Sequence, residues 1–483
     1  MPKTMSRAPT RDLRANASDG ERPGVRRGRR WLLATAARSL AGVAAAPHVW
    51  IPRSLYAQSS MRGRLKHLLY IRLSGGFRFQ VAFNARVDGR FNPFGAMQSP
   101  APGTEWGPGR LLEQAPYLTE QAGEALRALG VKPVSEITNQ LSVIPCVDHE
   151  PLAGSADGNH TTALERWYTG HVNGPAGLFT MINYGLRDRF AQAGAAGRVE
   201  LPAFVLGGSG MGRGRGKYAA HRPPVLGGNG LERFRLATDR SLPGWTSALS
   251  VDLDASMRDR QHVALQRTVD AYMQTRRATK AYAEIFASEL LRVRARSTQV
   301  VDNVSNRQLE EVFGDSGAAR GVRLALRLFH FGSPAIYLDQ GGYDMHSGER
   351  ERLPERMVEL NRLLSGLEWA LKTMDHPAGG RYWEHTLVVL GSEFSRTARG
   401  SPFNSAEGSD HGGDLATRWM SMPFMGGAIG RPGRSLGATR PSDLEASGKI
   451  YSYRSVLKTL MDLLGCDHSE FFPADAPFDD LWL

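Results

Sequence analysis

The sequence contains very little cysteine: Cys146 and Cys466 are the two such residues in a chain of 483. So few thiols exclude both a disulfide framework and a zinc motif built from cysteines. Whether the two pair with each other in an oxidising compartment stays open, because the sequence does not give the distance between their Cα atoms. The fold must therefore be held together by its hydrophobic core.

Long apolar runs are also scarce, and none outside the N-terminal region is long enough to span a bilayer. The composition is otherwise that of a globular protein, with 41% hydrophobic and 22% charged residues. A chain of 483 residues exceeds the size at which one hydrophobic core usually stops growing. We expect two domains or one elaborated α/β domain, with no stable transmembrane span once the N-terminal segment is removed.

Basic residues are concentrated at the N-terminus. Residues 1–57 hold 11 Lys and Arg against 3 Asp and Glu, so this segment supplies +8 of the formal net charge of +12 and the rest only +4. A balance that small, without a concentrated basic stripe, argues against nucleic acid as a partner.

The same N-terminal segment has the pattern of a targeting signal. Arg-Arg-Gly-Arg-Arg at 26–30 is followed by Trp-Leu-Leu at 31–33 and an alanine-rich run at 34–46. This resembles a twin-arginine signal, which implies transport of the folded protein by the twin-arginine export machinery to the periplasm or beyond. Cleavage is expected after residue 57, and an uncleaved segment would anchor the chain in the membrane. The alternative is a disordered basic tail beside a short buried helix.

After removal of the signal segment the mature chain comprises residues 58–483. Its first half contains two short apolar runs that predict strands, at 67–73 and 202–206. Residues 207–230 include nine glycines, and no amphipathic helix follows them directly, so we predict a loop and not a dinucleotide site. Helical apolar spacing at 256–291 predicts one or two amphipathic helices. We interpret the region of about 207–310 as a glycine-rich loop with a helical insertion.

The second half predicts a strand, helix, strand unit. Strands are expected at 334–338 and 386–390, and between them apolar residues from Met357 to Met374 mark one face of a helix. A further helix is predicted at 322–331. Because two strands joined in this way are nearly always parallel, the loops that follow them lie at the same edge of a sheet.

Polar residues suited to a metal site follow these strands. Asp344 and His346 are two residues apart after the first strand, so their side chains can reach one ion if the backbone is extended. Glu393 and Arg396 follow the second strand, and Asp410-His411 lies in a later glycine-flanked loop. Ligands of open α/β sheets gather at this carboxyl edge, where we expect these three segments to converge.

Three ordered motifs resemble those of the twin-arginine-exported family called domain of unknown function 1501, in the alkaline-phosphatase-like superfamily. They are Gly-Gly-Tyr-Asp-Met-His at 341–346, Ser-Glu-Phe-Ser-Arg-Thr at 392–397 and Ser-Asp-His-Gly at 409–412. A looser match surrounds Asn-His-Thr-Thr-Ala at 159–163. The resemblance covers about residues 60–483 and implies a three-layer α/β fold around a central, mostly parallel sheet.

The resemblance also implies an activity: hydrolysis or transfer of a small anionic phosphate or sulfate ester with the help of divalent metal ions. Asp344, His346, Asp410 and His411 are the candidate ligands, and Zn, Mn or Fe fits such a mixture of donors. Glu393 and Arg396 are candidate catalytic residues, and Arg396 can clamp an anionic group with two hydrogen bonds. The nucleophile is Thr161 by analogy with the superfamily, or else metal-bound water.

The chain departs from the family after its first strand, where relatives carry an Asp soon after Gly-Gly. Here Gly75-Gly76 is followed by Phe77-Arg78. The missing carboxylate argues against a two-metal mechanism. Two alternatives are open: Asp88 or Asn84 compensates from further along the loop, or Arg78 places a fixed positive charge where an ion would sit. Two hypotheses follow: an exported, metal-dependent ester hydrolase, and a catalytically degenerate periplasmic protein that binds a ligand on the same fold.

Overall fold

An eight-stranded sheet forms the centre of the fold, in the order β12-β2-β9-β8-β1-β7-β3-β4. Strand β9 runs antiparallel to β8 and β2, whereas the other neighbouring pairs of this sheet are parallel. The predicted α/β fold with a mostly parallel sheet is confirmed. The strands are β1 His67–Leu73, β2 Leu141–Asp148, β3 Phe204–Leu206, β4 Val225–Leu226, β7 Ala335–Gln340, β8 Thr386–Gly391, β9 Trp419–Met425 and β12 Tyr451–Ser452.

These elements come from a computed structural model, and all of them belong to the compact unit Ser54–Leu483. The residues that the structure describes are 61–79, 82–83, 120–149, 159–195, 200–208, 210–227, 244–262, 266, 282, 284–294, 296–396, 419–440 and 445–482. The predicted signal segment 1–57 lies outside them. Among the described helices, none is both long and apolar enough to cross a membrane.

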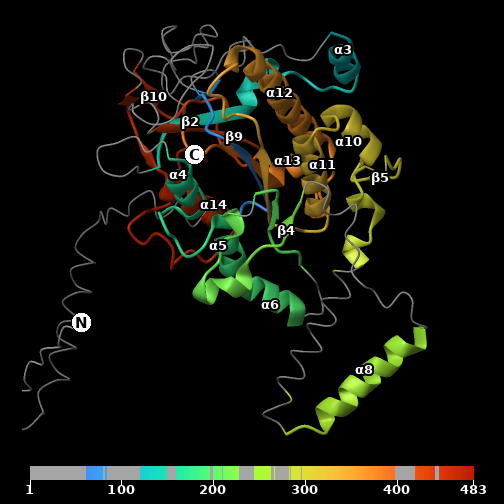
Figure 1. Ribbon diagram of the computed structural model, residues 1–483. Coiled ribbons are helices and arrows are strands. Elements are labelled where there is room, and N and C mark those ends of the chain that lie inside the picture. The colour runs from blue at the N-terminus through green and yellow to red at the C-terminus, as the bar shows by residue number, and fades with distance from the viewer. Residues whose placement is uncertain are drawn as a thin grey trace, which may run out of the picture. The chain divides into compact units, whose positions relative to one another are not determined.

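Helices cover both faces of the sheet (Figure 1). One core joins the β1 residues Leu69 and Ile71 to helices α10 Asn306–Phe313, α11 Gly317–His330 and α12 Glu349–Thr373. The other joins Leu68 and Tyr70 to α4 His160–Thr169, α5 Leu178–Gly185 and α14 Tyr453–Leu463. Alternate residues of one strand enter different cores because successive side chains point to opposite faces. The result is a three-layer arrangement with the sheet in the middle.

The predicted strand, helix, strand unit is present as β7, α12 and β8. The apolar residues that marked one helix face, including Met357, Leu364 and Met374, are buried. Strands β7 and β8 both pair in parallel with β1 and flank it, so that Arg72 lies opposite Asp339 on one side and Gly391 on the other. The loops that follow β1, β7 and β8 therefore leave the sheet at one edge.

The remaining described elements are loops, helices and short ribbons. The predicted loop at 207–230 contains the short 3-10 helices η4 Gly210–Gly212 and η5 Gly216–His221 before it reaches β4. Cys146 and Cys466 are buried free thiols. The other helices are α3 Glu120–Ala128, α6 Arg187–Ala195, α8 Gly244–Asp259 and α13 Tyr382–His385, and two small ribbons are β5 Val300–Val301 with β6 Val304–Ser305 and β10 Ala438–Thr439 with β11 Ala446–Ser447.

Candidate active site

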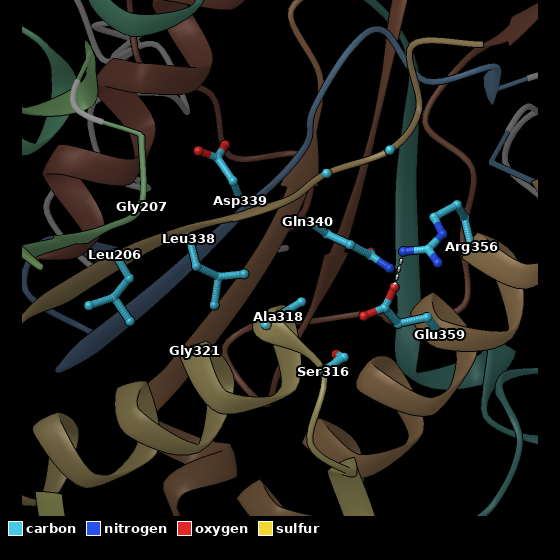
Figure 2. A pocket seen from close by; sticks show the side chains of 13 residues that line it. Leu206, Gly207, Ser316, Ala318, Gly321, Leu338, Asp339, Gln340, Arg356 and Glu359 are labelled. Carbon is cyan, nitrogen blue, oxygen red and sulfur yellow. Dashed lines mark hydrogen bonds and ion pairs between the residues drawn. The ribbon is translucent and has the colours of Figure 1, made fainter. Parts of the chain in front are cut away.

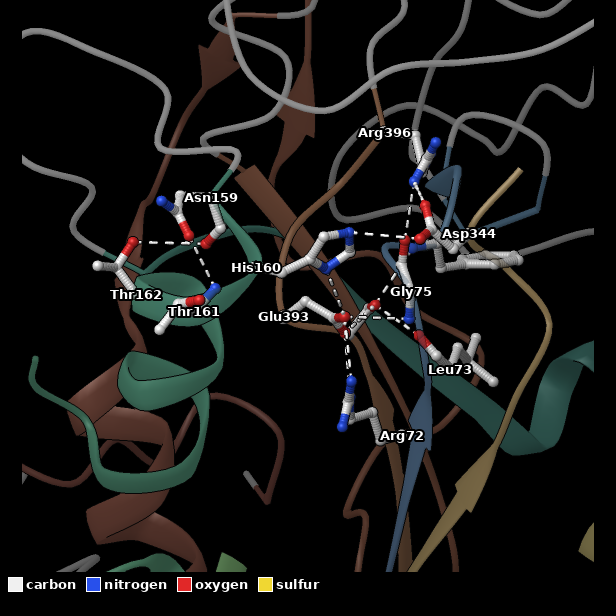
Figure 3. A network of polar contacts seen from close by, with 12 residues as sticks. Arg72, Leu73, Gly75, Asn159, His160, Thr161, Thr162, Asp344, Glu393 and Arg396 are labelled. Carbon is white, nitrogen blue, oxygen red and sulfur yellow. Dashed lines mark hydrogen bonds and ion pairs between the residues drawn. The ribbon is translucent and has the colours of Figure 1, made fainter. Parts of the chain in front are cut away.

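A network of charged side chains lies where β1, β7 and β8 end (Figure 3). Arg72 is the sixth residue of β1, Asp344 follows β7, and Glu393 follows β8. The parallel pairing of the three strands brings these residues together although up to 321 positions separate them in the chain. The convergence expected at the carboxyl edge is observed for the segments that the structure describes.

Glu393 is buried, with 1% of its surface exposed, and both carboxylate oxygens accept hydrogen bonds. Arg72 donates from Nε to Oε2 at 3.0 Å and from Nη2 to Oε1 at 3.1 Å, and the Gly75 backbone nitrogen donates to Oε1 at 3.0 Å. Burial alone would raise the pKa of Glu393, but hydrogen bonding with His160 and the Arg72 charge outweigh it and lower the pKa to about 2. Glu393 is therefore ionised at neutral pH.

Arg72 also connects Glu393 to neighbouring elements. Its Nη1 donates to the Tyr168 hydroxyl at 2.7 Å and lies 3.5 Å from Asp339 Oδ1. Asp339 in turn accepts from the Tyr337 hydroxyl at 2.6 Å and from the Gly208 nitrogen at 3.0 Å. These contacts fix the guanidinium group, so Arg72 is a structural member of the site.

Asp344 is the centre of a second cluster. Its Oδ1 accepts from Arg396 Nη1 at 2.7 Å and lies 3.1 Å from His346 Nε2. Burial opposes ionisation of Asp344, but the hydrogen bond and charge of Arg396 prevail and lower its pKa. Arg396 Nη1 also donates to the Gly75 carbonyl at 2.9 Å. Unlike Glu393, the Asp344 side chain is 48% exposed and can meet a ligand.

Gly75 allows the two loops to approach each other. Its φ is +113°, a backbone conformation that side-chain-bearing residues rarely adopt. A Cβ atom at this position would lie 2.4 Å from the backbone nitrogen of Asp344. Gly75 therefore serves the close contact with the Asp344 loop, and Gly76 serves a close contact with the Phe394 ring, independently of the carboxylate that this chain lacks.

His160 joins the two clusters. Its Nδ1 lies 3.5 Å from Glu393 Oε1 and its Nε2 lies 3.5 Å from Asp344 Oδ2. The histidine is the first residue of α4, whose N-terminus is capped by the Asn159 side chain, which accepts from the Thr161 backbone nitrogen at 2.8 Å. In Figure 3 the His160 ring points toward the carboxylates, whereas Thr161 lies on the other side of the helix start.

The structure brings some of the predicted site residues together but not all of them. The structure brings Asp344, His346, Glu393 and Arg396 together, and Thr161 does not point at them. Asp410 and His411 lie outside the described residues.

Two members of the network, Arg72 and His160, were not among the candidates. A signal for each was present: Arg72 is a charge inside an apolar strand, and His160 precedes Thr161 in a motif-like segment.

Arg78 forms a buried ion pair: its Nη1 lies 2.8 Å from Oε2 of Glu349, the first residue of α12. It also lies close enough to Arg396 for the two positive charges to repel each other. Arg396 is the arginine that donates directly to Asp344, so a fixed positive charge is present beside this carboxylate.

The described residues do not by themselves form a metal site. Asp344, His346 and His160 offer oxygen and nitrogen donors that Zn, Mn and Fe accept. However, Arg396 occupies Asp344 Oδ1, and no group of three or more described His, Cys, Asp or Glu side chains is placed to hold an ion. Metal binding here would depend on Asp410 and His411.

Comparison with solved structures finds two enzymes with weak similarity. One is PsFucS1 sulfatase from Pseudoalteromonas sp., with a TM-score of 0.40 and 10% identity over 90% of this chain and 76% of that one. The other is alkaline phosphatase from the Antarctic bacterium TAB5, with a TM-score of 0.30 and 10% identity over 84% and 99%. At such scores we transfer neither activity nor ligands from these enzymes.

Comparison by sequence is more informative about the family. No curated protein matches the chain. The family described as "Protein of unknown function (DUF1501)" matches residues 130–478, which is more than two thirds of the chain and includes the loops with Asp344 and Glu393. A match of this extent shows that the chain belongs to the DUF1501 family, as its motifs predicted.

Proposed function

We propose that the protein is a hydrolase of phosphate or sulfate esters whose active site surrounds His160, Asp344 and Glu393. The observation that carries the proposal is the position of His160 between two carboxylates, one buried and one half-exposed. An imidazole oriented by a buried carboxylate is a common arrangement for general acid–base catalysis. The motif resemblance supplies the ester class.

Each residue has a distinct role in this proposal. The ionised Glu393 accepts a hydrogen bond from the protonated Nδ1 of His160 and so orients the ring. His160 Nε2 then takes a proton from water as the water oxygen bonds to phosphorus or sulfur. The bond between that atom and the alcohol oxygen breaks, and His160 returns the proton to this leaving oxygen. Glu393 is a positioning residue in this scheme, and Arg396 holds the Asp344 carboxylate.

The place of Thr161 favours water as the nucleophile. Its side chain lies across the helix start from Glu393 in Figure 3, and its backbone nitrogen is used in the α4 cap. A small anionic ester would meet the exposed edge of Asp344, where the Arg396 charge reduces repulsion. Dependence on Zn, Mn or Fe stays a prediction that rests on Asp410 and His411.

A second function is favoured by the arginines. Arg72 and Arg396 each neutralise a carboxylate that a metal would otherwise use, and the family's Asp after Gly76 is absent. Both features suit a protein that kept the fold and binds a ligand without catalysis.

Metal content and turnover separate these functions. We would purify the mature full-length protein, measure bound metals by elemental analysis, and screen phosphate and sulfate esters for hydrolysis. The variants are Asp344→Asn and Asp410→Asn, with Asp375→Asn as control, because Asp375 is also an ion-paired carboxylate of similar exposure, 54%.

The proposal expects ester hydrolysis that Asp344→Asn lowers at least tenfold and Asp375→Asn leaves unchanged. A metal dependence expects about one ion or more per chain, lost in Asp344→Asn and Asp410→Asn. Absence of metal after reconstitution would refute that dependence. Absence of turnover on every ester would refute the hydrolase and leave the binding function.

A further inference from the structure

A cavity of about 530 Å³ is lined by the last three residues of β7, including Asp339, whose carboxylate also contacts Arg72. It is formed where β3 and β7 end, beneath the first turn of α11 and beside α12 (Figure 2). Its size falls within the range of small-molecule sites. It also sits at the carboxyl edge of the parallel strands, where α/β proteins commonly bind ligands.

The N-terminus of α11 supplies hydrogen-bond donors to this cavity. Ser316 caps the helix: its side chain accepts from the Ala319 nitrogen at 3.1 Å and its carbonyl from the Arg320 nitrogen at 2.9 Å. The nitrogens of Gly317 and Ala318, both at the cavity wall, precede these bonded groups and are the helix's first donors. A Cβ on Gly317 would meet nothing within 4 Å, so space lies in front of it. Such a terminus favours an anion.

Gln340 provides an independent sign of a ligand. It is the last residue of β7, it lines the cavity, and 1% of its surface is exposed. Neither its Oε1 nor its Nε2 has a hydrogen-bond partner among the described residues. A buried amide left in this way destabilises the fold unless a ligand satisfies it. Figure 2 shows the side chain running along the cavity wall toward Arg356 and Glu359.

The charged residues of the cavity are Arg356, Glu359 and Asp339, and the last of these is already bonded to Arg72, Tyr337 and Gly208. Arg356 and Glu359 pair with each other, Nη1 to Oε2, at 2.9 Å. A guanidinium group has five N–H donors, so this single bond leaves Arg356 able to bind an anion as well. Glu359 would repel a second negative group but accept from a hydroxyl. The hydroxyl of Tyr343 is likewise buried without a partner among the described residues.

We propose that this cavity, the α11 pocket, binds a small hydroxy acid: one carboxylate with one or more hydroxyl groups beside it. The carboxylate would lie between the α11 N-terminus and Arg356, and the hydroxyls would pair with the Gln340 amide and Glu359. The proposal does not depend on the proposed hydrolase function, because a free hydroxy acid contains no phosphate or sulfate ester.

Isothermal titration of the full-length protein with glucuronate, gluconate and lactate tests the site, with neutral glucose and inorganic phosphate as comparison probes. At least one hydroxy acid is expected to bind saturably and glucose is not. Gln340→Met and Arg356→Gln are each expected to weaken binding at least tenfold. Arg307→Gln, which alters a comparable Arg–Glu pair on the surface of α10, should leave the affinity unchanged.

Stability measurements separate loss of the site from loss of the fold. Gln340→Met removes an unpaired buried amide, so it is expected to unfold at the same or higher denaturant concentration than the wild type while losing the ligand. Failure of all three hydroxy acids to bind, or equal affinity in Gln340→Met and the wild type, would overturn the proposal. If glucose bound with the same affinity as the acids, the site would not require an anion. If phosphate bound as tightly as the best acid, the site would not be specific for a carboxylate.

Discussion

At the scale of single residues, the site depends on charges that are buried in pairs. The side chains of Arg72 and Glu393 are 7% and 0% exposed. Such a pair adds little net stability, because removing two charges from water costs about as much as their attraction returns. Removing only one partner of the pair is destabilising, because the other charge is left buried and uncompensated.

Arg72→Ala is therefore expected to lower the free energy of unfolding by about 3–5 kcal/mol. Adding Glu393→Gln to it should restore part of the loss, because the stranded charge is gone. Urea denaturation followed by circular dichroism measures both. Arg127→Ala is the control: it breaks an ion pair whose side chains are 54% and 41% exposed, so its effect should stay below about 1 kcal/mol. Similar losses in Arg72→Ala and Arg127→Ala would contradict the argument.

His67, at the start of β1, makes stability depend on pH. Burial is the main cause that lowers its pKa to about 3, and the nearby His376, His385 and Arg189 lower it further. Its Nδ1 lies 2.8 Å from the Ser333 carbonyl and its Nε2 3.0 Å from His376 Nε2. In the unfolded chain His67 binds a proton below about pH 6.5, whereas in the folded protein it stays neutral down to about pH 3. The free energy of unfolding therefore falls as the pH drops from about 6.5 toward 3.

We expect His67 alone to lower the free energy of unfolding by about 2 kcal/mol between pH 7 and pH 5. His67→Asn should remove this part of the pH dependence, because Asn can donate to the Ser333 carbonyl but does not titrate. Urea denaturation at pH 5, 6 and 7 gives the slopes. Parallel slopes for the variant and the wild type would show that His67 is not the group responsible.

At the scale of elements, helix ends are defined by short side chains. Helix α10 begins with a capping box: Ser305 accepts from the Gln308 nitrogen at 3.2 Å, and the Gln308 side chain accepts from the Ser305 nitrogen at 2.9 Å. This box satisfies two of the donors that a helix start leaves open. It also follows β6 directly, so it fixes where the chain turns into the core.

Ser305→Ala is expected to destabilise the protein by about 1 kcal/mol because the capping bond is lost. Gln308→Ala should cost less, and the double variant should cost less than the sum of both, since each member orients the other. Thermal or urea unfolding of the three variants measures the coupling. Strictly additive losses would mean that the two bonds act independently.

The unit of β7, α12 and β8 shows which elements a sequence reveals. Its helix face could be predicted from Met357 to Met374 because a packed helix repeats apolar residues with a period that the chain displays directly. The strands were predicted as well, with limits a few residues from those observed. The short strands β4 and β12 were not, since two residues contain too little pattern to distinguish a strand from a loop.

At the scale of the whole molecule, the charge of the chain is unevenly divided, with +8 in residues 1–57. We propose that this segment directs export by the twin-arginine route. Replacing Arg29 and Arg30 by lysine keeps the charge but removes the guanidinium pair, and should retain the full-length chain inside the cell. Immunoblots of periplasmic and cytoplasmic fractions measure this, with Arg11→Lys as control. Unchanged periplasmic protein in the double variant would refute the route.

The sequence by itself determined the layered α/β architecture, the order of β7, α12 and β8, and the edge at which Asp344, His346, Glu393 and Arg396 gather. The layered architecture was implied by the resemblance of the motifs. The order of the unit and the edge follow from apolar periodicity and from the geometry of parallel strands, which are local or nearly universal. The tertiary structure alone decided which charges meet: Arg72 with Glu393, Arg396 with Asp344, and His160 between them. Those contacts join residues from several loops, and they depend on β1 lying between β8 and β7, a strand order that no local pattern encodes.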